Sequence, residues 1–143
     1  MSEDKHAGDA SRYAEEMLAK DRASQSLGIA VEVTGAGAAT ARVRVRDDML
    51  NGFGVCHGGH LFALADTAFA FACNTYGVVT VAAGGSIDFL RPVHAGDELT
   101  ATATERRRGK RTGVYDVVVR NQHGKDVALF RGRAHVTRSA SDS

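Results

Sequence analysis

The chain has 143 residues, 43% of them hydrophobic, and a formal net charge of +1 at pH 7. This length predicts one domain with a real hydrophobic core, and the small net charge gives no global electrostatic basis for binding nucleic acid or a membrane. The two cysteines, Cys56 and Cys73, make no disulfide framework and fit a reducing compartment. The polar first residues lack the apolar core of a signal peptide, so we expect a cytoplasmic protein.

The N-terminal part predicts a tail and a short helix ahead of the main domain. Residues 1–8 are expected to be disordered and residues 9–23 to form a helix, with Ser11 as a candidate cap for its first turn. We therefore divide the chain into a tail and short helix over 1–22, a main domain over 23–138 and a flexible tail over 139–143.

Alternating apolar residues then predict a hairpin. Residues 27–33 and 39–46 both alternate as half-buried strands do, with a glycine-containing turn between them. A glycine-rich loop over 51–60 follows and leads into a long apolar helix, predicted over 60–75. Because apolar residues lie on nearly every side of this helix, we expect it to be buried, and it is too short and alanine-rich for a membrane span.

Four further strands are predicted after the long helix. They cover residues 78–90, 98–107, 112–121 and 126–137, and the glycine pair Gly84-Gly85 in the first of them indicates a bulge or a close approach. Turns between consecutive strands imply an antiparallel sheet. Since such a sheet has one face for the long helix, the predicted fold class is α+β in two layers.

One carboxylate, Asp66, lies inside the apolar helix. A buried carboxylate is costly unless it is hydrogen-bonded, paired or protonated, and the plain structural alternative is an Asp bonded to nearby backbone or to a Thr. The loop before the helix favours chemistry, because its glycines let a ligand approach the free N–H groups at the helix start. Such donors suit a developing oxyanion, and with a carboxylate they are the parts of an acyl-transfer site.

The spacing of these two features constrains the site. Gly58 and Asp66 are eight residues apart, which along a helix axis is roughly 12 Å. One carbonyl carbon can hardly be served by both groups of a single helix. The simplest arrangement is a two-fold homodimer in which Gly58 of one subunit faces Asp66 of the other. A structure with both groups of one chain in one cleft would remove this hypothesis.

At these residues the chain resembles the hotdog-fold acyl-CoA thioesterases, and most closely the phenylacetic acid degradation thioesterase family. The resemblance covers roughly residues 23–136 and rests on Asn51, His57-Gly58-Gly59, Ala65-Asp66-Thr67-Ala68 and Ile87-Asp88-Phe89-Leu90-Arg91-Pro92. It implies an antiparallel sheet wrapped around the long central helix, and dimers often paired into homotetramers. The activity it implies is hydrolysis of acyl-CoA thioesters such as phenylacetyl- or hydroxyphenylacetyl-CoA, with no metal and no cofactor besides the CoA of the substrate.

The same resemblance implies roles at the site. Asp66 would act as general base on water or as nucleophile on the thioester carbonyl, and both stay open. Gly58 would polarise the carbonyl oxygen through its backbone N–H, with Gly59 beside it against the substrate. Asn51 would orient the water or the carbonyl, unless it caps its own turn. His57 would position the acyl carbonyl, or else hold the loop by a hydrogen bond.

Basic residues are the candidates for the CoA phosphates. Arg91 follows the strand predicted over 78–90, and Lys110 and Arg111 end the basic cluster 106–111 at a predicted hairpin turn. In the hotdog fold this hairpin is expected near the CoA nucleotide, where basic side chains pair with phosphates. The plain alternative is a solvated hairpin tip. Nucleic-acid binding is disfavoured because the cluster is short and lacks interleaved aromatic residues.

One position departs from the family pattern. Some acyl-CoA hydrolases of this fold carry a hydroxyl on the long strand after the helix to hold the water, and the position that we align with it is Ala82. Thr80, Ser86 or Thr67 would have to replace that hydroxyl. Otherwise the positioning of the water depends more on Asp66 and Asn51.

Other functions remain as alternatives. A hotdog hydratase or dehydratase would use His57 or His60 as its base and leave the thioester intact, whereas a thioesterase frees a thiol. An acyl-CoA-binding module would bind without releasing thiol. A Cys56 nucleophile is disfavoured because adjacent Cys and His side chains rarely point the same way, and a metal site because the spacing does not follow the paired zinc patterns.

Overall fold

The computed structural model of the chain describes residues 12–139. The expectations for residues 1–8, for the Ser11 cap and for most of the tail over 139–143 therefore lie outside the described residues. Residues 12–20 are helical, and a second, short helix follows. This helix is α2 (Arg22–Leu27).

The prediction of a single helix over 9–23 is wrong in one respect, because the helix is interrupted at Asp21. The Asp21 side chain accepts a hydrogen bond from the Ser24 N–H at 2.9 Å and so begins α2 as its N-cap. Gly28, in the left-handed region with φ 74°, ends α2. Leu27, which we expected at the start of a strand, is consequently the last residue of α2.

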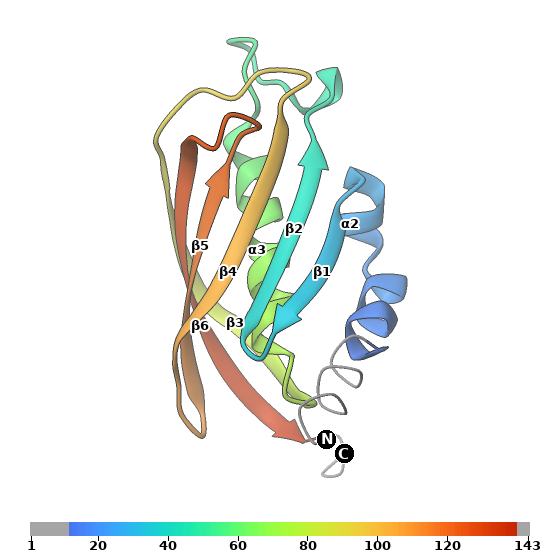
Figure 1. Cartoon of the computed structure of the whole chain (residues 1–143), viewed down its shortest axis with the longest axis vertical. Helices are drawn as coiled ribbons and strands as arrows, with labels where there is room; N and C mark the ends of the chain where they lie inside the picture. The colour runs from blue at the N-terminus through green and yellow to red at the C-terminus, as the bar shows by residue number, and fades with distance from the viewer. Residues whose placement is uncertain (1–11, 140–143) are drawn as a thin grey trace.

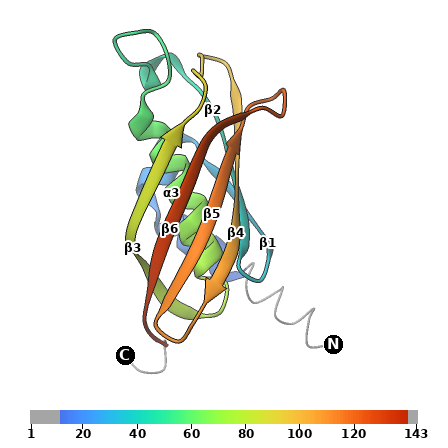
Figure 2. The same cartoon turned by 90° about the vertical axis from the view of Figure 1, so that its left-hand side faces the viewer.

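The rest of the chain forms one antiparallel sheet and one long helix, as predicted. The sheet order is β1-β2-β4-β5-β6-β3, and every neighbouring pair is antiparallel. Figure 1 shows α3 running along one face of this sheet, and Figure 2 shows the strands curving around it. The elements are β1 (Ala30–Gly35), β2 (Ala38–Arg44), the 3-10 turn η1 (Asp47–Met49), α3 (Gly58–Cys73), β3 (Val78–Phe89), β4 (Glu98–Arg108), β5 (Thr112–Arg120) and β6 (Asp126–Ser139).

The long helix α3 is the centre of the core, because residues on most of its circumference are buried. One of its side chains lies directly over Gly132 of β6, where an added Cβ would lie 2.8 Å from the Phe69 ring. The same ring packs against Tyr115 and Phe130, with centroids 5.6 and 5.8 Å away. Among the described residues no helix is long and apolar enough to cross a membrane.

An arginine holds the C-terminal end of α3. Arg108 donates to the Cys73 carbonyl at 3.1 Å and to the Tyr115 hydroxyl at 3.3 Å, and its guanidinium lies 4.5 Å from the centre of the Tyr76 ring. A cation at this end complements the helix dipole. The basic cluster predicted over 106–111 is therefore divided, because this residue is structural and faces the core.

Strand β3 is one edge of the sheet, and much of it is exposed. Its glycine pair marks a bulge, as predicted, because the register against β6 shifts between Ala82 and Gly84. Val79, Val81 and Phe89 are 43%, 45% and 54% exposed. Unpaired backbone groups and apolar side chains along an edge strand are a template for another chain.

We expect Gly132→Ala to lower the free energy of unfolding by about 1–3 kcal/mol, because the new methyl group would meet the Phe69 and Phe130 rings. Gly35→Ala is the matched control in β1, since nothing lies within 4 Å of the Cβ there. Denaturant unfolding at one protein concentration measures both variants. Equal stability of the two would show that the contact between α3 and β6 is looser than described.

Candidate active site

The loop before α3 is fastened to the helix by His57. The His57 Nδ1 accepts a hydrogen bond from the Gly59 N–H at 2.8 Å, which makes His57 the N-cap of α3. Because Nδ1 accepts, the neutral ring carries its proton on Nε2. Two roles were open for His57, and the structure contains the hydrogen bond by which it holds the loop. The Nε2–H of the exposed His57 ring stays available to a ligand.

The first turn of α3 leaves one backbone donor unused. A helix begins with four N–H groups that have no partner inside the helix. The N–H of Gly59 bonds the His57 ring, and those of His60 and Leu61 bond the His57 carbonyl at 2.9 and 3.4 Å. Within residues 12–139 no acceptor bonds the Gly58 N–H. This donor lies at the positive end of the helix dipole, where a developing oxyanion is stabilised.

Gly58, which carries the unused donor, lines a cleft of about 370 Å³. One wall is the loop and the start of α3, and the other is the segment that follows β3. The cleft is lined by Asn51, Val55, Cys56, Gly58, Leu61, Phe89, Leu90, Arg91, Pro92 and Val93. Three predicted site residues thus meet in one place, namely Gly58, Asn51 and Arg91.

The apolar wall of this cleft was missed by the sequence interpretation. A Cβ on Gly58 would lie 2.8 Å from Cζ of Phe89, so the ring reaches across to the helix start only because position 58 has no side chain. Phe89 and Leu90 belong to the segment that carries the family resemblance, and this was the available signal. Their apolar surfaces beside the donor indicate a ligand with an apolar part.

The oxygen of the Asn51 side chain stabilises the loop, and its amide nitrogen is available to a ligand in the cleft. Its Oδ1 accepts from the Phe53 N–H at 2.9 Å and from the Val55 N–H at 3.3 Å, so it does cap its own turn. These bonds fix the orientation of the amide, because only the oxygen can accept. The two Nδ2 hydrogens have no acceptor among the described residues. Asn51 therefore presents donors, not an acceptor, to a ligand in the cleft.

Asp66 lies two turns further along α3 and does not line this cleft. It is half-buried, and within residues 12–139 nothing donates a hydrogen bond to its carboxylate. Burial, and to a smaller extent the charge of Asp21, raise its pKa above the ordinary 3.8. The neighbouring Thr67 bonds the Ala63 carbonyl instead, at 2.8 Å. The structural alternative, in which backbone or a Thr satisfies Asp66, is not observed.

The remaining predicted site residues lie apart from one another. Gly59 is exposed beside the His57 ring, next to the cleft. Lys110 and Arg111 are exposed in the turn between β4 and β5. In Figure 1 this turn lies at the end of the sheet opposite the loop before α3. One chain therefore does not bring these two residues to Gly58.

The three hydroxyls considered as replacements at Ala82 lie in different places. Ala82 pairs with the buried Ala134, so it faces the α3 side of the sheet. The Thr80 hydroxyl is used on the Val78 carbonyl at 2.9 Å, and Ser86 pairs with Arg131 on the outer face. Among the described residues, the hydroxyls of Thr80, Ser86 and Thr67 all lie outside the lining of the cleft.

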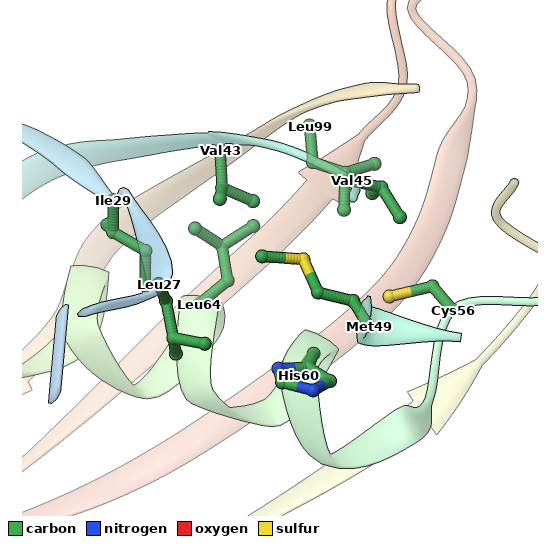
Figure 3. A pocket seen from close by; sticks show the side chains of 9 residues that line it. All are labelled: Leu27, Ile29, Val43, Val45, Met49, Cys56, His60, Leu64 and Leu99. Carbon is green, nitrogen blue, oxygen red and sulfur yellow. The ribbon is translucent and has the colours of Figure 1, made fainter. Parts of the chain in front are cut away.

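A second cavity lies behind the loop and is apolar (Figure 3). It is lined by Leu27, Ile29, Val43, Val45, Met49, Cys56, His60, Leu64 and Leu99, and its volume of about 10 Å³ suits roughly one water. His60 thus faces the core, away from the cleft, which weakens its case as a hydratase base. The buried Cys56 thiol has a pKa raised by desolvation, which disfavours a thiolate nucleophile.

Comparison with known proteins agrees with this geometry. Residues 53–128 match the thioesterase superfamily. The chain belongs to the thioesterase superfamily. The acyl-coenzyme A thioesterase PaaI of Escherichia coli (strain K12) is 53% identical to this thioesterase over 119 residues, which are 83% of this chain and 85% of that protein.

Solved structures show the same relationship. The E. coli PaaI protein from the phenylacetic acid degradation operon has a TM-score of 0.90 and 49% identity, covering 93% of this thioesterase and 96% of that chain. A hypothetical thioesterase protein from Streptococcus pneumoniae with coenzyme A has a TM-score of 0.71 and 28% identity, covering 77% and 88%. The predicted family, the hotdog-fold acyl-CoA thioesterases, is confirmed, and so is the hotdog fold.

We expect Asp66→Asn to stabilise this thioesterase at neutral pH. Because the pKa of Asp66 is raised in the folded chain, the wild type keeps its full stability below the ordinary pKa of 3.8 and loses some as the pH rises through the folded value. The gain of the Asn variant should therefore be larger at pH 7.5 than at pH 4.5, as thermal or denaturant unfolding measures.

The control for this prediction is Asp126→Asn, the same change of charge at an exposed Asp that pairs with Arg120 at 2.8 Å. A gain for Asp66→Asn that stays constant between the two pH values, or a loss at pH 7.5, would contradict the raised pKa.

Proposed function

We propose that this thioesterase hydrolyses acyl-CoA thioesters, and that arylacetyl groups such as phenylacetyl or hydroxyphenylacetyl are its preferred acyl groups. One observation carries the proposal: Gly58, with its unused N–H, lines a cleft with an apolar wall, on the same helix as a carboxylate that receives no hydrogen bond from the described residues. The acyl group is supported by the name and operon of the E. coli relative and by the exposed Phe89 and Leu90 in the cleft.

The chemistry follows from the donors and the carboxylate. The thioester oxygen accepts from the Gly58 N–H, with Asn51 Nδ2–H as a second donor. Asp66 takes a proton from water while the water oxygen attacks the carbonyl carbon. The tetrahedral intermediate then expels the CoA thiolate and yields the free acid; the proton held by Asp66 neutralises the thiolate or returns to solvent. This route needs no metal and no redox cofactor.

The environment of Asp66 favours the general base over the nucleophile. A general base at neutral pH gains from a raised pKa, and burial in the apolar helix raises it in that direction. A nucleophile attacking the carbonyl would not need this shift. The absence of donors on the carboxylate among the described residues also leaves its oxygens accessible to a water.

The reaction needs two subunits, because Gly58 and Asp66 are separated by about 12 Å along one rigid helix. A two-fold dimer supplies Asp66 of the other subunit to each cleft. The exposed edge strand β3 supports this arrangement, since pairing two such edges would extend the sheet and bring two α3 helices side by side, antiparallel. Two dimers would make a homotetramer.

The same two-fold arrangement would bring the predicted CoA-binding residues together at one cleft. Arg91 is the one cationic side chain among the described residues that line the cleft. Lys110 and Arg111 lie at the end of the sheet opposite the cleft of their own chain. In an antiparallel dimer, the same two residues of the partner subunit would lie towards the cleft. Arginine and lysine in those places would pair with the CoA phosphates. The two free cysteines support a cytoplasmic location.

Wild-type protein should release thiol from acyl-CoAs, with phenylacetyl-CoA among the best, and Asp66→Asn should lower kcat about 10²–10⁴-fold because it removes the base. A thiol-reactive dye measures turnover across a panel of acyl-CoAs. Retained hydrolysis in Asp66→Asn would contradict the assigned base. Water addition to an enoyl-CoA without thiol release would favour the hydratase, and binding without either reaction would favour the binding module.

Asn51→Asp isolates the donor role of Asn51. The aspartate keeps an oxygen for the Phe53 and Val55 N–H groups but loses the Nδ2 donors, so we expect kcat/KM to fall about 10²–10³-fold. Asn121→Asp is a matched control, because Asn121 Oδ1 accepts from the His123 and Lys125 N–H groups at 3.0 and 3.1 Å in another turn. Equal activity of both variants would remove Asn51 from the mechanism.

A further inference from the structure

The N-terminal helix α2 is joined to α3 by a buried polar contact. The Ser24 hydroxyl, in a residue only 2% exposed, lies 3.0 Å from the Thr67 hydroxyl of α3. Ser24 is itself held by Asp21, whose Oδ1 accepts from the Ser24 N–H at 2.9 Å and whose Oδ2 accepts from the Ser24 hydroxyl at 2.7 Å. Both oxygens of the Asp21 carboxylate are thus engaged by one residue.

The two hydroxyl hydrogens of this cluster serve three contacts. Ser24 and Thr67 have one hydroxyl hydrogen each, and the Ser24 hydrogen goes to the Asp21 carboxylate. The Thr67 hydrogen goes to the Ala63 carbonyl at 2.8 Å, so the longer contact between the two hydroxyls competes with these two bonds for a hydrogen. Ser24 is therefore bonded to the negative charge of Asp21 on one side and lies in close buried contact with Thr67 of α3 on the other.

We propose that Asp21 is a positioning residue for Asp66: its carboxylate holds Ser24, which contacts Thr67 of α3, and this contact brings a second negative charge to the part of α3 that carries the catalytic carboxylate. Thr67 directly follows Asp66 on α3, so the cluster and the carboxylate share one short stretch of helix. This inference rests on the proposed function, in which Asp66 is the general base.

The electrostatic consequence has a definite sign. Burial raises the pKa of Asp66 most, and the Asp21 charge raises it further. The other titratable group that interacts with Asp66 is the Cys73 thiol on α3. Burial raises the pKa of this thiol to about 12, and the charge of Asp66 is a smaller cause in the same direction. No cation within residues 12–139 offsets these effects on Asp66. Asp21 therefore makes Asp66 a stronger base and moves its protonation to higher pH.

Asp21→Asn removes this charge and keeps the architecture. Asn is as good an N-cap as Asp, and its Oδ1 still accepts from the Ser24 N–H. Its Nδ2 would donate to the Ser24 hydroxyl, which would turn its own hydrogen to Thr67, and Thr67 would keep the Ala63 carbonyl. Each contact of the cluster then has its own hydrogen, and only the bond between position 21 and the Ser24 hydroxyl reverses its direction. Asp21→Ser, a second capping residue without charge, serves if the Asn variant folds poorly.

The test measures the titration of Asp66 directly and through catalysis. Carboxyl ¹³C NMR, with the Asp66 signal assigned by its loss in Asp66→Asn, gives the midpoint, and the acid limb of kcat/KM against pH gives the kinetic counterpart. We expect both to move to lower pH in Asp21→Asn. Asp126→Asn, an equal charge change at the exposed pair with Arg120, should move neither.

The outcomes separate this inference from the proposed function. Unchanged NMR midpoints in both uncharged variants at position 21, with Asp66→Asn inactive, would overturn the role of Asp21 and leave Asp66 as the base. Undiminished thiol release by Asp66→Asn would overturn the proposed mechanism, and with it the reason for Asp21 to act on catalysis. A shift of equal size in Asp126→Asn would reduce the effect to net charge and also overturn the inference.

Discussion

The site depends on one straight helix lying close against a curved sheet. Gly132 of β6 lets α3 approach until the Phe69 ring fills the space that a side chain at position 132 would take. His57 fixes the N-terminal end of the helix and Arg108 its C-terminal end. With both ends and the middle fixed, α3 has no freedom to bend. The positions of Gly58 and Asp66 are therefore set by helix geometry alone.

In the proposed mechanism, this rigidity makes each chain hold half of two different sites. Its cleft has donors, an apolar wall and one arginine but no base, while its Asp66 has no donors to work with. An open sheet edge lies on the same molecule, and its exposed residues have no partner among the described strands. The proposed two-fold axis at that edge would resolve both deficits at once, because antiparallel helices would bring the start of one beside the middle of the other. The catalytic site would then form only in the dimer.

The sequence predicted the strand and helix order closely because each depends on a local period of apolar residues. The break at Asp21 was missed, since the hydrogen bond that Asp21 accepts from the Ser24 N–H as N-cap lies inside an otherwise helical pattern. The sequence named Gly58, Asn51 and Arg91, which meet in the cleft, but Phe89 was missed because its place opposite Gly58 depends on strand pairing through β6. Arg108 was counted with a basic cluster, and only the tertiary contact with the Cys73 carbonyl shows its structural role.

Asp66 illustrates why a site of this kind costs stability. Its carboxylate is half-buried, it lacks hydrogen-bond donors among the described residues, and the nearest charge that acts on it is another carboxylate. A chain selected for stability alone would place an apolar residue or a cation there. The N-terminal helix instead adds the charge of Asp21, which is held by its hydrogen bonds to Ser24 next to α3. A carboxylate whose pKa is raised by burial and by a like charge is typical of a catalytic centre, which agrees with the proposed base.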